Sequence, residues 1–256
     1  KRQRQEFVQR SITAICLSAV VVALVLFSPN LILNTFVFLL SLALFFEWMK
    51  VSKASRKKKI IFLLLFSSLI CCILGFGALL EPIPIITMLG ITVWIVIAFQ
   101  IFFREGRLSS SFSFTNFWIG LILISTFCLT CFQFVNGSRL FLLIAIFNVA
   151  IFDSGAYIIG KNFGKNSFLP ELSPNKTIEG LIGGLASSIV FVTLLYILIE
   201  EVSLKASIAL MLSIPFALCG DYFFSFLKRK ANIKDTGSIL PGHGAVSYTH
   251  LRAHET

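Results

Sequence analysis

The chain has 256 residues, of which 57% are hydrophobic and only 13% are charged, and its mean hydropathy is +0.90. This composition excludes a soluble single-domain protein, because one core of this size cannot bury so much apolar surface. The net charge of +10 does not indicate nucleic-acid binding, since the lysines and arginines form short runs between long apolar stretches. We therefore predict a protein whose solvent is the lipid bilayer.

Eight apolar stretches are long enough for membrane-spanning helices, which need about 20 residues each. Turn residues such as Ser28-Pro29-Asn30 and Asn136-Gly137-Ser138 separate neighbouring stretches. The predicted fold class is all-α, a polytopic transmembrane bundle of about eight helices. In chain order the predicted helices are Val8–Phe27, Leu31–Trp48, Ile60–Leu80, Ile83–Phe103, Phe117–Phe134, Leu140–Ile159, Gly180–Ile199 and Ile208–Phe226.

The basic residues fall on one side of this predicted bundle. All but two of the 22 lysines and arginines lie in the N-terminal segment up to Arg10 or in the connections after the second, fourth, sixth and eighth helices. The two exceptions are Arg139 and Lys205. Because loops rich in lysine and arginine remain in the cytoplasm, the N-terminus and these connections are predicted to be cytoplasmic. With no organelle-targeting segment visible, a bacterial inner membrane is the expected location.

The six cysteines all lie within apolar segments, where neither disulfides nor metal binding are expected. Cys128 and Cys131 have the spacing of a redox motif, but no βαβ pattern surrounds them. We interpret the cysteines as small hydrophobic packing residues. Gly180 and Gly184 likewise have the small-xxx-small spacing that allows two membrane helices to pack closely.

Two carboxylates stand out within the apolar pattern. Asp153 and Asp221 each lie inside a predicted helix, near its cytoplasmic end, where a charged group costs up to about 2.5–3.5 kcal/mol on insertion scales. One interpretation is a structural hydrogen bond to a neighbouring serine or tyrosine. The other is a functional site, and it is favoured by the spacing of Asp221, Ser225 and Lys228, which places them on one helix face that Arg229 extends. Such a face suits a metal ion that bridges to phosphate oxygens.

The connection between the sixth and seventh predicted helices is rich in glycine and lysine. Glycines allow a ligand to approach the backbone, and lysines supply positive charge. Ser173 or Thr177 is expected to cap the next helix and so direct its first N–H groups toward an anion. The connection is therefore a candidate phosphate-binding segment, with an ordinary flexible loop as the alternative.

Together these residues resemble the phosphatidate cytidylyltransferase family, also called CDP-diglyceride synthetases. The resemblance covers roughly the second half of the chain, and its third block is long and has a rare spacing. The three blocks are Asp153-Ser154-Gly155-Ala156-Tyr157 with Gly160 and Gly164-Lys165; Ser173-Pro174-x-Lys176-Thr177-x-Glu179-Gly180; and Ser225-x-x-Lys228-Arg229-x-x-x-x-Lys234-Asp235-x-Gly237-x-x-Leu240-Pro241-Gly242-His243-Gly244.

The resemblance implies transfer of a cytidylyl group from CTP to phosphatidic acid, with Mg²⁺ as cofactor and no nucleic-acid partner. A second cation and a homodimer are compatible with it. It assigns Asp221 to the metal. The implied catalytic residues are Asp221, Lys228, Arg229, Asp235 and His243, and the implied substrate- and phosphate-binding residues are Asp153, Ser173, Lys176, Thr177, Ser225 and Lys234.

The chain also departs from the family pattern. Phe224 stands where the family usually has glutamate, and after Gly244 no Asp-Arg-x-Asp run or final membrane helix follows. We expect residues 1–116 to form N-terminal transmembrane helices, residues 117–244 the catalytic transmembrane region with its cytoplasmic loops, and residues 245–256 a non-native tail. A chain that ends in this way is predicted to be inactive.

Two other functional classes fit intramembrane carboxylates. A transporter would use them as an ion path, but it also predicts paired interrupted helices in the two halves of the chain, and the sequence shows none. The other class is a different membrane enzyme that acts on lipid phosphates or polyprenols, such as a CTP-dependent lipid kinase, which would transfer the γ-phosphate of CTP to its lipid.

Overall fold

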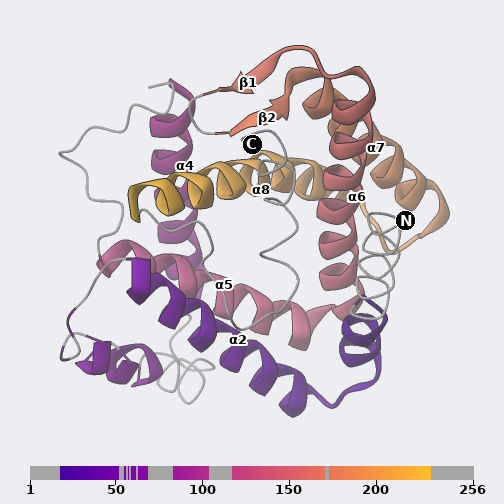
Figure 1. Ribbon diagram of the computed structural model, residues 1–256. Helices are drawn as coiled ribbons and strands as arrows, with labels where there is room; N and C mark the ends of the chain where they lie inside the picture. Colours follow the sequence, from indigo (N-terminus) through magenta and orange to yellow (C-terminus); the bar gives the residue numbers. More distant parts are fainter. Residues whose placement is uncertain are drawn as a thin grey trace, which may run out of the picture.

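The computed structural model describes residues 18–51, 55, 57, 59–61, 63–68, 83–103, 117–170 and 173–231 (Figure 1). Helical segments lie within Ser18–Phe27 and Lys59–Ser68. The labelled elements are α2 (Asn30–Val51), α4 (Ile83–Phe103), α5 (Phe117–Gly137), α6 (Arg139–Phe163), β1 (Ser167–Leu169), β2 (Ser173–Thr177), α7 (Ile178–Leu198) and α8 (Leu204–Ala231).

The predicted all-α membrane bundle is confirmed. Within the described residues, α2, α5, α6, α7 and α8 each contain a stretch long and apolar enough to cross a membrane, and α4 contains the shorter apolar helix Thr87–Phe102. Many large apolar side chains point outward, among them Leu31 and Leu198, which are 78% and 76% exposed. Such an outer surface is stable in lipid and costly in water. The predicted helices Val8–Phe27 and Ile60–Leu80 are described only in part.

The main apolar core lies where α2, α4, α5 and α8 meet. Figure 1 shows α2 beside α5, and α8 crossing the middle of the bundle next to α4. Phe45, Ile101 and Cys219 are completely buried in this core, as is Cys128. The expected packing role is thus confirmed for Cys128 and Cys219.

Helices α6 and α7 form the most extensive helix contact, because glycines line it. A Cβ atom at Gly184 would lie 2.8 Å from the carbonyl oxygen of Phe152, and one at Gly180 would lie 2.8 Å from that of Ala156. Real side chains do not tolerate such distances to backbone, so the two helices approach at backbone contact. The packing role predicted for Gly180 and Gly184 is confirmed.

A buried polar contact connects α6, α7 and α8. The Asn148 side-chain amide donates to the carbonyl oxygen of Leu210 (3.0 Å), and the Ser188 hydroxyl donates to Asn148 Oδ1 (2.7 Å). Asn148 and Ser188 are fully buried. Polar bonds of this kind orient membrane helices, which lack a hydrophobic force between them. The contact fixes α8 relative to the α6–α7 pair.

Arg139, one of the two basic residues outside the predicted cytoplasmic set, has a structural role. Its guanidinium donates to the carbonyl oxygen of Ser28 (2.7 Å) and contacts the Asn30 side chain. The charge therefore stabilises carbonyl groups at the end of the first helical segment.

The connection between α6 and α7 is a β-hairpin, which the sequence interpretation did not include. Strands β1 and β2 are antiparallel, with Ser167 opposite Thr177 and Leu169 opposite Ser173. Figure 1 shows the hairpin at one edge of the bundle, beside the adjoining ends of α6 and α7. A flexible loop was the alternative, and the structure instead holds the lysine-bearing segment as a strand.

Candidate active site

A cavity of about 570 Å³ lies between α6, the hairpin, the start of α7 and α8. Apolar walls such as Phe152, Phe168 and Leu218 enclose a group of polar side chains. The polar and tyrosine residues that line it are Asp153, Tyr157, Lys161, Lys176, Thr177, Asp221 and Tyr222. Four predicted site residues, Asp153, Lys176, Thr177 and Asp221, are thus brought together from three elements, α6, β2 and α8.

The centre of this arrangement is an ion pair between Lys176 and Asp221. The Lys176 ammonium also lies over the Tyr222 ring, 4.7 Å from its centroid. The side chains of Lys176 and Asp221 are 32% and 58% exposed, so water reaches both groups. A lysine on β2 and a carboxylate on α8 are therefore held together across a wet cavity, with an aromatic face that favours the cation.

The neighbouring hydroxyls do not account for the two carboxylates. Ser154 donates to the carbonyl oxygen of Ala150 (2.7 Å), and Ser225 donates to that of Asp221 (2.9 Å). Both bonds lie within their own helices, a common arrangement for serine in a membrane helix. The partner found for the Asp221 carboxylate is a lysine 45 positions away (221 − 176), which favours the functional interpretation.

Thr177 ends β2 and caps α7, as one of the two predicted capping residues. Its hydroxyl accepts a bond from the backbone N–H of Gly180 (3.2 Å). Gly160 and Gly164 lie against this cap, and a Cβ at Gly164 would be 2.7 Å from Thr177 Oγ1. Glycine at these positions lets the end of α6 pack against the first turn of α7, which closes one wall of the cavity.

Glu179 fastens the start of the hairpin to α7. Its carboxylate accepts the backbone N–H groups of Lys165 (3.0 Å) and Asn166 (3.2 Å), and the Asn166 side-chain amide (3.0 Å). The Ile178 N–H donates back to the carbonyl oxygen of Asn166 (2.8 Å). These bonds hold β1 in place, and β1 holds β2, which carries Lys176.

Of the remaining predicted site residues, the structure describes the side chains of Ser173 and Ser225 only. Ser173 begins β2 and Ser225 lies on α8, and neither lines the cavity. Lys228 and Arg229 belong to the last two turns of α8, beyond Asp221, and their side chains are outside the described set. Lys234, Asp235 and His243 lie outside the described residues.

Phe224 belongs to another part of the structure. It lines a second, smaller cavity of about 170 Å³ among α2, α4, α5 and α8, with apolar neighbours such as Trp48 and Trp94. The departure from the family pattern at position 224 therefore leaves the lining of the larger cavity unchanged.

Two more lining residues, Tyr157 and Lys161, were not among the predicted site residues, although Tyr157 belongs to the first motif block and Lys161 to the candidate phosphate-binding segment. They are four residues apart on α6, and the Lys161 ammonium lies 5.6 Å from the centroid of the Tyr157 ring. The signal that identifies this pair in the sequence is the i, i+4 spacing, the same spacing that relates Asp221 to Ser225.

The donor set suits one kind of metal binding. Among the described residues, no group of three or more His, Cys, Asp or Glu side chains could hold a metal by itself. Two carboxylates, Asp153 and Asp221, line one cavity. Mg²⁺ commonly binds through one or two carboxylates, with water and substrate phosphates as its other ligands. Two carboxylates in one cavity would therefore suit a magnesium ion.

Comparison with known proteins places these features in a family. A model of the cytidylyltransferase family matches residues 8–246. The phosphatidate cytidylyltransferase of Bacillus subtilis (strain 168) is 41% identical over 97 residues, which cover 37% of this chain and 36% of that protein. The phosphatidate cytidylyltransferase of Staphylococcus aureus (strain COL) is 40% identical over 109 residues, which cover 41% of this chain and 42% of that protein. The one of Aquifex aeolicus (strain VF5) is also 40% identical over 109 residues, which cover 42% of this chain and 40% of that protein. The matched part thus spans about two fifths of each relative.

Proposed function

This chain belongs to the cytidylyltransferase family, and we propose that it transfers the cytidylyl group of CTP to phosphatidic acid, releasing pyrophosphate and forming CDP-diacylglycerol. The observation that carries the proposal is the cavity in which Asp153, Asp221 and Lys176 meet between candidate membrane spans. A phosphate-binding cation and metal-binding carboxylates next to lipid are what a reaction between a nucleotide and a lipid phosphate requires. The matching relatives are phosphatidate cytidylyltransferases.

In the proposed reaction an oxygen of the lipid phosphate attacks the α-phosphorus of CTP. The bond from this phosphorus to the bridging oxygen of the β-phosphate breaks, and pyrophosphate leaves with both electrons of that bond. Bound Mg²⁺ would neutralise charge on the phosphates. Asp221 and Asp153 would hold the ion, and Lys176 would stabilise the negative charge that develops on the transferring group.

The family motif suggests roles for further residues of this chain. Lys228 and Arg229 follow Asp221 on α8, where they would bind phosphates of the leaving group. The motif residues Ser173, Thr177, Ser225, Lys234, Asp235 and His243 would complete the surroundings of the site. A second cation and a homodimer are compatible with this arrangement.

We also propose that the site faces the cytoplasm of a bacterial cell, with the chain in the inner membrane and its N-terminus inside. The distribution of lysine and arginine supports this orientation. CTP is a cytosolic nucleotide, so the orientation brings the cavity to the side where the substrate is available.

Position-specific labelling of CTP tests the function. The assay runs the 256-residue chain beside a chimera in which the C-terminal region of the Bacillus subtilis relative follows residue 244 of this chain. Label from the α-phosphate of CTP should enter the lipid. Label from the γ-phosphate in lipid would instead identify a lipid kinase, and failure of both labels to enter would overturn the proposal.

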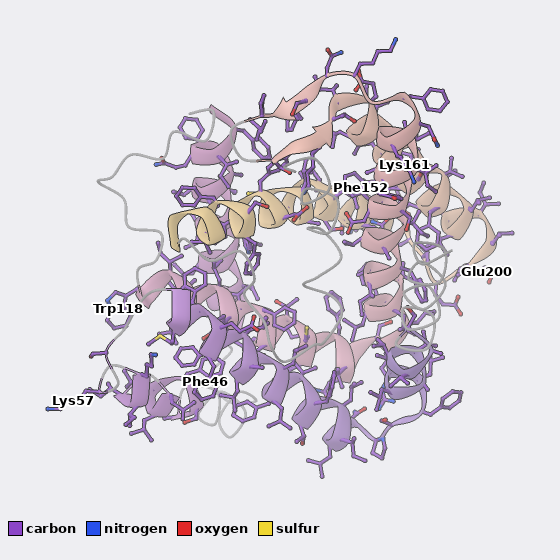
Figure 2. The ribbon with its side chains drawn as sticks, in the orientation of Figure 1. Phe46, Lys57, Trp118, Phe152, Lys161 and Glu200 are labelled. Atoms are coloured by element: carbon purple, nitrogen blue, oxygen red, sulfur yellow. The ribbon has the colours of Figure 1, made fainter. Side chains whose placement is uncertain are left out.

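Two variants connect the activity to the cavity. Asp221→Asn should abolish incorporation of the α-label, because it removes a proposed metal ligand. Glu200→Gln makes the same chemical change at an exposed position in the turn between α7 and α8, and should retain activity (Figure 2). Equal activity of the two variants would refute the assignment of Asp221.

A further inference from the structure

The cavity contains a second positively charged side chain besides Lys176. Lys161 lies near the end of α6, and Tyr157 lies one turn before it. Figure 2 shows Lys161 on the same helix as Phe152 and closer to the hairpin. Both Lys161 and Tyr157 are exposed, whereas Phe152 is buried, so the pair lies at the outer rim of the cavity.

The two cavity lysines differ in how their charge is balanced. Lys176 pairs with Asp221. Lys161 contacts the Tyr157 ring, and no ion pair involves it in the part of the chain that the structure describes. A lysine without a carboxylate partner, partly shielded by an aromatic ring, provides a binding point for an anion, and lysine commonly binds phosphate as a point charge.

The surroundings of Lys161 indicate a lipid as the source of that anion. Lys161 is two residues from the end of α6, whose sequence is apolar enough to span a membrane. Ile158 and Phe163 beside it are 55% and 64% exposed, and Tyr157 is 62% exposed. Lysine and tyrosine at the end of a membrane helix, next to exposed apolar side chains, are typical of the interface where lipid headgroups lie.

Resting on the proposed function, we propose that Lys161, supported by the ring of Tyr157, binds the phosphate monoester of phosphatidic acid at the rim of the cavity. The exposed apolar side chains of α6 contact the acyl chains. Lys176 and the two carboxylates then serve the nucleotide and its metal. The two lysines thereby separate two phosphate-bearing substrates, one that arrives from the membrane and one from water.

Equilibrium binding tests the assignment without requiring turnover. The detergent-solubilised 256-residue chain is titrated by calorimetry with dioctanoyl phosphatidic acid, and separately with Mg²⁺ and CTP. Lys161→Gln should weaken phosphatidic acid binding about tenfold, the loss expected for one charge-assisted contact. Binding of CTP should change less than about twofold on the same scale.

Control variants separate this contact from general charge and from folding. Lys205→Gln removes an exposed lysine at the start of α8, outside the cavity, and should bind phosphatidic acid like the unaltered chain. Lys161→Arg should restore most of the affinity that Lys161→Gln loses. Dioctanoyl phosphatidylglycerol, a phosphodiester with similar chains, should bind more weakly and show little dependence on Lys161.

Several results would overturn the assignment. These are failure of the unaltered chain to bind dioctanoyl phosphatidic acid, undiminished binding by Lys161→Gln, and a loss that falls mainly on CTP. Equal losses in Lys161→Gln and Lys205→Gln would also overturn it, since they indicate a general charge effect. Failure of the proposed function is distinguishable: the label would not enter lipid, while Lys161-dependent binding of phosphatidic acid would still support the headgroup site.

Discussion

Replacement of Lys176 by methionine should have opposite effects on metal binding and on nucleotide binding. In the structure Lys176 neutralises Asp221, the proposed metal ligand. A divalent cation that binds Asp221 must therefore displace the lysine, which is then available for a phosphate. Lys176→Met removes the competitor but also removes the phosphate contact.

The sizes of both effects follow from the exposure of the pair. Because Asp221 and Lys176 are partly exposed, their pairing is worth about 0.2–1 kcal/mol, so its loss should strengthen metal binding up to about fivefold. A hydrogen bond to a charged phosphate contributes about 1.5–3 kcal/mol, so CTP should bind roughly ten- to a hundredfold more weakly. A variant that is merely misfolded would bind both the metal and CTP more weakly.

Titration with Mn²⁺, a paramagnetic substitute for Mg²⁺, measures the change in metal binding. Bound Mn²⁺ is detected by the loss of the electron paramagnetic resonance signal of the free ion. Calorimetric titration with CTP measures the change in nucleotide binding. Lys205→Met, a lysine to methionine change outside the cavity, should alter neither. Weaker Mn²⁺ binding by Lys176→Met, or unchanged binding of CTP, would refute the proposed exchange of partners.

Three further predictions concern the framework that positions the site. Gly184→Ala should lower the free energy of unfolding by about 1–3 kcal/mol, since its Cβ would overlap the backbone of α6. Gly137→Ala should have little effect, because nothing lies within 4 Å of a Cβ there. Thermal unfolding in detergent compares the two variants. Asn148→Leu should cost about 0.6–1.7 kcal/mol in the same assay, and an unchanged transition would show that the amide does not fasten α8. Glu179→Ala should weaken CTP binding several-fold, because β2 would no longer hold Lys176 in place. Glu179→Gln keeps one acceptor oxygen and should retain part of the affinity. Equal CTP affinity of the two variants and the unaltered chain would exclude a positioning role for Glu179.

The helices could be predicted because each is a long apolar stretch bounded by turn residues. The predicted helix Ile83–Phe103 coincides with α4, and the predicted start of α5 at Phe117 is also found. The extension of α6 to Phe163 was missed because Lys161 and Asn162 interrupt the apolar pattern. A membrane helix continues past such residues when it emerges from the lipid, where water supplies their partners.

The hairpin could not be predicted from its residues. Strand β2 contains Pro174 and Asn175, both of which are unfavourable in strands, and β1 has only three residues. Its stability comes from tertiary contacts, chiefly those of the Glu179 carboxylate with the backbone at Asn166. A carboxylate thirteen positions along the chain leaves no local periodic signal (179 − 166).

The spacing of residues along one helix predicted some of the site residues but not the partner of Asp221. Asp221 and Ser225 do share a stretch of α8, but the serine hydroxyl bonds to its own helix. The partner of Asp221 is supplied by β2, so it depends on the packing of α8 against the α6–α7 pair through Asn148. Helix patterns identify which side chains are unusual in lipid, whereas their pairing is decided by tertiary structure.

The balance of charge in the cavity connects these observations. Among the described residues, its lining includes two carboxylates, Asp153 and Asp221, and two lysines, Lys161 and Lys176, so the formal charges cancel. A cavity of this kind stays close to neutral while empty, which lowers the cost of placing ionised groups beside lipid. Metal and phosphates carry opposite charges, so a bound metal would offset part of the negative charge of the nucleotide. Binding of the nucleotide alone would disturb the balance more, and this favours joint entry of the metal and the nucleotide.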